Sequence, residues 1–348
     1  MRNSILKNAS ASFHVFAAAP FLFAAFALDQ MPAYGNEAAT AEAAELKQAD
    51  TAFYRAFEQR NLWEMSQLWL QADYVSAIHP AHATPFLNWD NVRMSWRQTF
   101  AHNRDIKIRQ RAGFVHSIGS VAWVIDSTRF ESIQTQTGQP ILMDNVLATK
   151  IFEKHGNQWR LVHYHAHLPN LDMQAQAHEH SDIRGKATAG LADGITQATS
   201  DFYKAFAQRD LGAMGQVWAQ SDYVSAVHPD YPAPFLGWDQ VKTSWRQTFA
   251  YSRDIRIHPY VAENPISGPG SGMFATAQFD PIGHWPALHV RNAGSVAWII
   301  DSIRFDAVQT ETRQPIHIDN VLTTQIFEKH QDTWLLVHFH AHRGPSAH

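Results

Sequence analysis

The feature that most constrains this chain is a nine-residue stretch that occurs twice. Residues 159–167 read WRLVHYHAH, and residues 334–342 read WLLVHFHAH. In a β-strand successive side chains point to opposite faces, so the three histidines of each stretch share one face. The two sets are His163, His165 and His167, and His338, His340 and His342. Each stretch is therefore predicted to be a strand with an imidazole face.

The repeat extends well beyond these strands. DYVSAIHP at 73–80 recurs as DYVSAVHP at 222–229, and SWRQTF at 95–100 recurs unchanged at 244–249. Matching residues lie 149 apart up to Phe249 and 175 apart from Ser295 onward, so the second copy contains 26 additional residues. A period of this length indicates duplicated domains, because a solenoid would need much shorter units.

These offsets predict the division of the chain. A first domain covers 41–168 and a second covers 195–343, with the insertion near 259–287. The intervening residues 169–194 are rich in small residues with Pro and Gly, which is typical of a linker. Residues 1–35 have a positive start, an apolar run and small residues at 33 and 35, which is the layout of a signal peptide.

Within a copy, the patterns predict helices first and a meander of strands afterwards. Apolar residues at helical spacing predict three helices, and runs of β-formers between turn residues predict the strands. The expected helices are 41–59, 62–70 and 89–100, and the expected strands are 74–78, 106–116, 121–135, 141–153 and 159–167. This order predicts an α+β fold with helices packed on one face of an antiparallel sheet.

The composition of the chain limits its possible compartments and its possible partners. The net charge of −4 carries no basic stripe, which argues against nucleic acid as a partner. The chain has no cysteine, so disulfides and thiol catalysis are excluded. The predicted signal peptide implies a secreted and periplasmic protein with no membrane span after cleavage; an uncleaved anchor is the alternative.

At this point the residues carry a resemblance to a known family. The element order, the W-x-x-V-H-x-H closing strand, the strand ending at His79-Pro80 and the entry Phe86–Trp89 to the third helix resemble the SnoaL-like branch of the nuclear transport factor 2-like superfamily. The resemblance covers each repeat from end to end. It implies two tandem cone-shaped domains, each with three helices on a curved antiparallel sheet and a pocket between them.

The sequence lacks some residues that are typical of members of this superfamily. The superfamily includes ketosteroid isomerases, yet a tyrosine with two aspartates at matching places is not found. The kinase association domains carry basic residues along the pocket strands, where this chain has Lys150 in one copy and Gln325 in the other. One superfold hosts many chemistries, so the resemblance is informative about fold and weak about function.

The histidine strands have two interpretations. Two imidazoles on one strand face can reach one metal ion, so the six histidines are candidate ligands of a divalent metal. Alternatively, this face packs on the other domain, giving an intramolecular pseudo-dimer in which the histidines hydrogen-bond across the contact. The second interpretation is preferred, no cofactor is predicted, and a homo-oligomer remains open.

Two pairs of titratable residues are candidate acids or bases. His79 and His228 each end a strand where such a cone would open, and histidine can act as acid or base near neutral pH. Asp126 and Asp301 lie inside apolar strands, where a carboxylate must pair, bond or shift its pKa. A lysine or histidine across the sheet is the expected partner, since Arg129 and Arg304 would point to the opposite face.

The candidate ligand-binding residues are those expected inside the cone. Trp96 and Trp245 lie on the inner face of the third helix, and an aromatic wall suits flat, apolar ligands. The others are Lys150, Tyr164 and Phe339. Three hypotheses follow: binding of a small, largely apolar molecule, a proton-transfer enzyme of isomerase, dehydratase or cyclase type, or metal binding.

Overall fold

The computed structural model describes residues 37–169, 193–261, 275–276 and 289–344. The predicted signal peptide, nearly all of the predicted linker and most of the predicted insertion lie outside these residues. In the described part, no helix is both long enough and apolar enough to cross a membrane.

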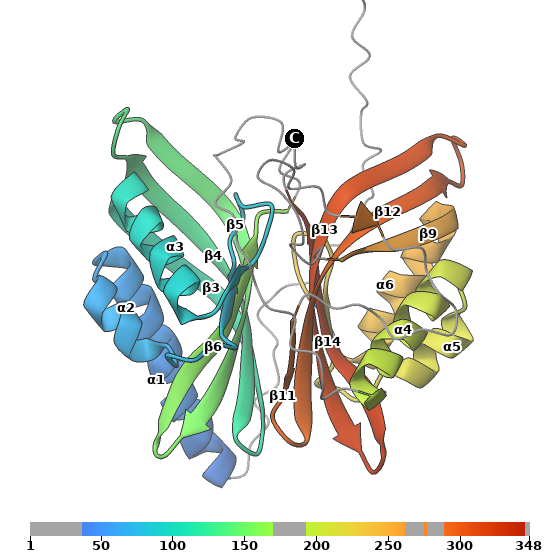
Figure 1. Ribbon diagram of the computed structural model, residues 1–348, viewed down its shortest axis with the longest axis horizontal. Helices are drawn as coiled ribbons and strands as arrows, with labels where there is room; N and C mark the ends of the chain where they lie inside the picture. Colours follow the sequence, from blue (N-terminus) through green and yellow to red (C-terminus); the bar gives the residue numbers. More distant parts are fainter. Residues whose placement is uncertain (1–36, 170–192, 262–274, 277–288, 345–348) are drawn as a thin grey trace, which may run out of the picture. The chain divides into compact units, whose positions relative to one another are not determined.

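The first copy folds in the predicted order (Figure 1). Its helices are α1 (Glu37–Glu58), α2 (Leu62–Leu68) and α3 (Trp89–His102). Its strands are β1 (Ser76–Ile78), β2 (Phe86–Leu87), β3 (Asn103–Ile118), β4 (Val121–Gln134), β5 (Pro140–His155) and β6 (Gln158–His167).

The second copy repeats that order. Its helices are α4 (Asp193–Gln208), α5 (Leu211–Val217) and α6 (Trp238–Tyr251). Its strands are β7 (Ser225–Val227), β8 (Phe235–Leu236), β9 (Ser252–Val261), β10 (Ala275–Thr276), β11 (His289–Asn292), β12 (Val296–Gln309), β13 (Pro315–His330) and β14 (Thr333–Arg343).

Each copy contains one sheet. The first sheet has six strands in the order β2-β1-β6-β5-β4-β3, and the second has eight, in which β11 pairs with β12 beside the path β10-β9-β12-β13-β14-β7-β8. The predicted α+β architecture of two tandem domains with three helices each is therefore confirmed. The sheets are not wholly antiparallel, because β1 and β7 pair in parallel with the closing strands β6 and β14. A parallel pair needs a long connection, and a helix and four strands lie between β1 and β6.

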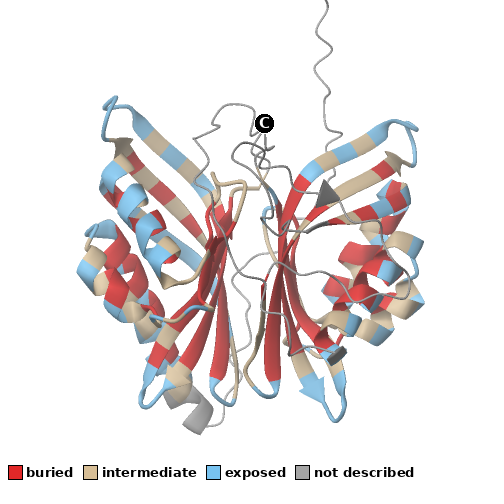
Figure 2. Ribbon diagram, in the orientation of Figure 1, coloured by how far each residue is buried: buried red, intermediate tan, exposed pale blue. Residues whose placement is uncertain are grey.

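The helices of each copy cover one face of its sheet, and the core lies between them (Figure 2). In α1 the buried residues Leu46, Phe53, Ala56 and Phe57 recur at helical spacing, so one stripe of the helix faces the sheet. The second copy buries the matching set on α4.

The turn before the third helix has the same backbone shape in both copies. Asn88 and Gly237 are the N-caps of α3 and α6, with φ of 68° and 78°. Positive φ is rare for most residues and is tolerated best by Gly and Asn, which explains why these two types occupy this turn. The two residues occupy matching positions of the repeat, 149 apart.

The sheet face away from the helices is buried as well. The six histidines of β6 and β14 lie on it and are at most 2% exposed. His163 and His165 hydrogen-bond to Thr324 of the second copy, and the equivalent His338 and His340 bond to Thr149 of the first. The closing strands therefore meet across the contact between the two copies.

Candidate functional site

Three of the predicted site residues come together inside the first domain. Trp96 projects from α3, Tyr164 from β6, and His79 follows β1. The ring centroid of His79 lies 4.8 Å from that of Trp96 and 5.6 Å from that of Tyr164, while the Trp96 and Tyr164 centroids are 5.4 Å apart. Phe53 of α1 lies within 5.5 Å of both. These side chains form an aromatic wall in the interior.

His79 is held as a neutral side chain in this wall. Its Nε2 lies 2.9 Å from Ser95 Oγ, which itself donates to the Val92 carbonyl. Because the serine hydrogen is used there, His79 donates to the serine oxygen. Burial lowers the pKa of His79 to about 3. His228 makes the same bond to Ser244, and burial lowers its pKa to about 4. This arrangement favours a positioning role for both histidines over acid–base chemistry.

A cluster of charged and polar side chains lies beside the wall. Lys150 of β5 donates to Asp126 Oδ2 over 2.7 Å and to the Tyr54 hydroxyl over 2.8 Å, and it forms an ion pair with Asp50 Oδ1 over 2.5 Å. Tyr54 donates to both oxygens of Asp126 over 2.9 Å. Gln110 of β3 donates to both carboxylates over 2.7 Å. These five residues are called the Lys150 cluster below.

The cluster brings two carboxylates to one ammonium inside the protein. The side chains of Lys150 and Asp126 have no exposed surface, and that of Asp50 is 5% exposed. Burial raises the pKa of Asp126, Lys150 opposes this shift, and the nearby Asp50 adds to it. Burial and Asp126 together raise the pKa of Tyr54 well above its usual value. The pKa of the buried Asp126 carboxyl therefore lies above its ordinary value although Lys150 is bonded to it.

The sequence found part of this cluster and missed the rest. Asp126 and Lys150 were predicted, and the lysine is the expected cross-strand partner of the aspartate. Asp50, Tyr54 and Gln110 were not predicted. A signal for Asp50 existed, because it lies four residues after Leu46 and three before Phe53, on the apolar stripe of the first helix.

The cluster lies one side chain below the surface. Gln110 is exposed, although its amide bonds to both buried carboxylates. Gly113, also exposed, pairs directly with Asp126 in the β3–β4 ladder. A Cβ added to Gly113 would lie 3.8 Å from the Asp126 Cβ, so the glycine leaves the strand beside Asp126 without a covering side chain. Movement of Gln110 would therefore expose the carboxylates.

The second domain has different charges at the position that corresponds to the Lys150 cluster. Gln325 stands where the first copy has Lys150, and Thr199 where it has Asp50. Gln325 Nε2 donates to the Tyr203 hydroxyl over 2.9 Å and to Asp301 Oδ2 over 3.1 Å. The aromatic wall persists, with the Trp245 centroid 4.9 Å from His228 and 5.5 Å from Phe339. The predicted residues again lie together, but the described residues at this site supply one carboxylate and no ammonium.

The histidine strands form hydrogen bonds that leave few nitrogens for a metal. Of the twelve ring nitrogens, only Nε2 of His167 and Nε2 of His342 have no partner in the described part of the chain. Over the same residues, no group of three or more His, Cys, Asp or Glu side chains is arranged to hold a metal ion. The geometry favours the second interpretation of these strands, a contact between the domains.

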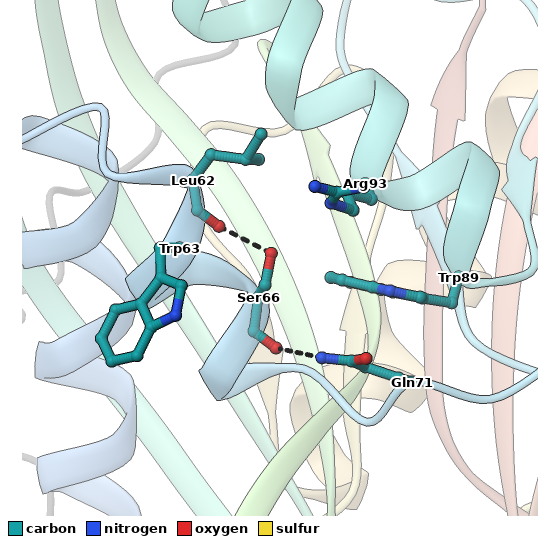
Figure 3. A pocket seen from close by; sticks show the side chains of 6 residues that line it. All are labelled: Leu62, Trp63, Ser66, Gln71, Trp89 and Arg93. Atoms are coloured by element: carbon teal, nitrogen blue, oxygen red, sulfur yellow. Dashed lines mark hydrogen bonds between the residues drawn. The ribbon is translucent and has the colours of Figure 1, made fainter.

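A hollow of about 460 Å³ lies on the surface of the first domain between α2 and α3 (Figure 3). Leu62, Trp63, Ser66, Gln71, Trp89 and Arg93 line it. None of the predicted site residues is among them. The second copy has Gly212 and Gly215 in place of Trp63 and Ser66, so it lacks an equivalent indole. This hollow is separate from the interior cluster.

Comparison with known proteins identifies the family of both copies. The SnoaL-like domain family matches residues 46–170 and 195–281, which together make up more than half of the chain. Among curated proteins, the F-box protein SKIP8 of Arabidopsis thaliana is 29% identical over 125 residues, covering 36% of this chain and 50% of that protein. The chain thus spans about half the length of the curated relative it matches.

Several solved structures resemble part of the chain. A nuclear transport factor 2-like superfamily protein of Salmonella enterica is 15% identical and covers 40% of this chain and 99% of its own, with a TM-score of 0.36. A ketosteroid isomerase-like protein of Erwinia carotovora is 16% identical and covers 36% and 95%, with a TM-score of 0.33. The association domain of Caenorhabditis elegans CaMKII is 16% identical and covers 38% and 99%, with a TM-score of 0.32. From the match of the family to both copies, the chain belongs to the SnoaL-like domain family and carries two copies of that domain in tandem.

Proposed function

We propose that the first domain binds a small molecule with a flat, largely apolar body and an uncharged polar head. The body lies against Trp96 and Tyr164, and the head reaches the Lys150 cluster. The observation that carries this proposal is the difference in charge between the two copies at one place in one fold. Lys150 and Asp50 in the first copy are Gln325 and Thr199 in the second.

The second copy serves as an internal control for the first. A buried ion pair is weak support for stability, because removing charges from water costs about as much as their attraction returns. The second domain folds the same way with no lysine among the described residues at this place. The fold therefore does not require the charges of the first copy. Clustered, perturbed titratable groups in a domain interior are typical of functional sites.

The balance of charge indicates the chemistry of the head group. The cluster has two carboxylates and one ammonium, so any net charge is negative and an anionic ligand would be repelled. A carbonyl or hydroxyl oxygen can accept a hydrogen bond from Lys150 or Tyr54, and a hydroxyl can also donate to a carboxylate. An aromatic ketone or phenol has both the polar head and the flat body.

Binding of uncharged aromatic ketones and phenols, such as 2-acetylnaphthalene and 2-naphthol, tests this proposal. Titration calorimetry would compare the natural protein with Asp126→Asn and with the matched variant Asp301→Asn. We expect Asp126→Asn to weaken binding at least tenfold, because a group in contact with the ligand changes, and Asp301→Asn to have no effect. Equal affinities for all three proteins, or no binding of either probe, would contradict the proposal.

The raised pKa of Asp126 favours a second candidate function, proton transfer at carbon. A carboxylate base of raised pKa can take a proton next to a ligand carbonyl while Lys150 and Tyr54 stabilise the oxygen anion that forms. Mass spectrometry of 2-acetylnaphthalene incubated in D₂O separates the two functions. Deuterium gain at the methyl group that depends on Asp126 indicates an enzyme, and binding without exchange indicates a binding protein.

We also propose that the chain is exported to the periplasm. The support is the charge and hydropathy pattern of residues 1–35. Cell fractionation with N-terminal sequencing tests this, with an expected mature N-terminus at Asn36. Recovery of the intact chain from the cytoplasm would contradict it.

A further inference from the structure

The contact between the two sheets contains two hydrogen-bonded chains of histidines. One begins at Ser76 Oγ, 2.8 Å from His163 Nδ1, and continues through Thr324 Oγ1, His165 and His342. The other begins at Ser225 Oγ, 2.8 Å from His338 Nδ1, and continues through Thr149 Oγ1, His340 and His167. Every link is 2.8 to 2.9 Å long.

The pattern of links fits neutral rings. A neutral imidazole has one donor and one acceptor nitrogen, and a hydroxyl can accept from one ring and donate to the next. Each chain can therefore run from its serine to its last ring with one hydrogen in every bond. At the last step His165 Nε2 lies 2.8 Å from His342 Nδ1, and His167 Nδ1 lies 2.8 Å from His340 Nε2. Two cations in either pair would bring two N–H groups face to face.

Among the described residues, the array has no counterion for a protonated ring. The rings of His165 and His340 stack with centroids 3.7 Å apart, so two cations there would repel at close range in a dry interior. The groups facing the rings from the neighbouring strands are the hydroxyls of β1, β5, β7 and β13 and the imidazole of His289 on β11. None of these is an acid.

The carboxylates of the same contact are bonded elsewhere. Glu153 accepts from Tyr74, from His155 and from Arg291 of the second copy. Glu328 accepts from Tyr223, on whose ring His116 stacks at 4.0 Å, and pairs with His330. The hydrogen-bonded partners of the array in the described segments therefore include no anion that could neutralise an added proton.

We infer that this array makes the contact between the two domains acid-sensitive, so that proton uptake separates the two sheets while each domain stays folded. Separation lets water solvate the rings, and each can then become a cation at its ordinary pKa of about 6.5. In the closed contact, burial lowers the pKa of His163, His338 and His342 to about 3. Burial also lowers the pKa of the other three well below the ordinary value.

These pKa shifts determine the direction and the steepness of the pH dependence of the contact. The closed contact binds fewer protons than the open one, so it is favoured above about pH 6.5 and weakens as the pH falls toward 3. Each additional proton bound by the open form lowers the ratio of closed to open molecules about tenfold per pH unit. With two or more histidines titrating, that ratio falls at least about a hundredfold per unit.

Energy transfer between one dye on each domain measures the separation. The chain has no cysteine, so Arg97→Cys on α3 and Arg246→Cys on α6, both exposed, give two clean attachment sites. We expect transfer to fall steeply below pH 6 and to recover on return to pH 7.5, while far-ultraviolet circular dichroism stays constant. Transfer that persists to pH 4.5, or that disappears together with the circular dichroism, would overturn the inference.

Variants test the histidines themselves. His165→Gln with His340→Gln keeps hydrogen-bonding side chains that do not titrate and should shift the midpoint to lower pH. His155→Gln with His330→Gln, which changes two exposed histidines that pair with glutamates, should leave the midpoint unchanged. Should the first pair of substitutions prevent folding, the natural protein still decides the matter: a slope of fewer than two protons per transition would refute the inference.

Discussion

Lys150 is a lysine with no exposed side-chain surface, which is uncommon in a folded protein. Its ammonium is surrounded by two carboxylates, a phenol and the ring of Phe53, whose centroid lies 5.5 Å away. The protein tolerates this charge because every partner is in place. Removing one partner should therefore cost more than removing the whole set.

Lys150→Gln copies the residue of the second domain and leaves Asp50 and Asp126 without a cation. We expect it to lower the free energy of unfolding by about 3–5 kcal/mol at neutral pH, the range for breaking a buried ion pair. The loss should be smaller at lower pH, because a protonated Asp126 is cheaper to bury and its pKa is already raised. Urea unfolding at several pH values measures both.

The double variant Lys150→Gln with Asp50→Thr reproduces the uncharged pair of the second domain. We expect it to recover most of the stability that the single variant loses, since fewer uncompensated charges remain buried. If the double variant were as unstable as the sum of the two single variants, the ion pairs would not be coupled as described.

Gly237 gives a second prediction at this scale. Its φ of 78° and ψ of 153° lie in a region that is nearly exclusive to glycine. Gly237→Ala should therefore lower the free energy of unfolding by about 1–3 kcal/mol through backbone strain. Asn88→Gly, at the matching position, should change stability by no more than a few tenths of a kcal/mol, because it exchanges a capping bond for relief of strain. Equal losses in thermal unfolding would refute this explanation.

The sequence predicts the role of a residue well when that role depends on the backbone around the residue itself. It predicts the role poorly when that role depends on contacts with distant strands. Asn88 and Gly237 occupy matching positions of the repeat because a turn of positive φ restricts its own residue type. The partner of Asp126 was predicted as a basic side chain across the sheet, since Lys150 lies on the next strand. Gln110 was missed because its contact with Asp126 depends on strand register and on a β-bulge between Gln110 and Ala112.

At the level of elements, both faces of the closing strands β6 and β14 make contacts that matter for the proposals above. Tyr164 and its register partner Lys150 face the interior of the first domain, whereas His163 and His165 face the second domain. One strand therefore contributes both to the candidate ligand site and to the contact between the domains. The alternation of side chains was evident in the sequence, but which face met which layer depended on packing with residues far away in the chain.

Thr324→Val tests how strongly the two closing strands depend on one hydroxyl. This oxygen bonds to both His163 Nε2 and His165 Nδ1, and valine has the same shape without the hydroxyl. Two buried nitrogens would lose their partner, at about 1–3 kcal/mol each. We expect urea unfolding to show a loss of roughly 2–4 kcal/mol.

The equivalent substitution Thr149→Val should cause a similar loss, because Thr149 bonds in the same way to His338 and His340. Thr248→Val removes only a hydroxyl that donates to a carbonyl of its own helix, and should change stability by about 0.5 kcal/mol or less. A loss of that small size for Thr324→Val would mean that the hydroxyl does not hold the histidines together.

At the level of the whole molecule, the two copies are interchangeable on the contact face and different inside. Both copies contribute one serine, one threonine and three histidines to the contact, and each threonine bonds to the other copy's histidines. The interiors differ in charge, and the two copies differ by the insertion. Duplication has thus preserved the contact while the interiors diverged, which the sequence revealed as exact matches in some stretches and substitutions in others.

This equivalence predicts the behaviour of the first domain alone. Residues 41–168 expressed by themselves would expose His163, His165 and Thr149, together with buried apolar residues of the same face such as Leu147. A second copy of the domain presents the complementary set, because each threonine finds its histidines on the other molecule. We therefore expect a symmetric homodimer, the common outcome for a self-complementary face.

Sedimentation equilibrium at pH 7.5 would measure this association. Thr149→Val in the isolated domain should weaken it, since the substitution removes the hydroxyl from both halves of the dimer at once, so its effect counts twice. Lys150→Gln, on the other face of the same strand, serves as the comparison and should leave the association constant unchanged if the domain remains folded. A folded, monomeric first domain at micromolar concentration would mean that the linker, and not the face, keeps the two copies together.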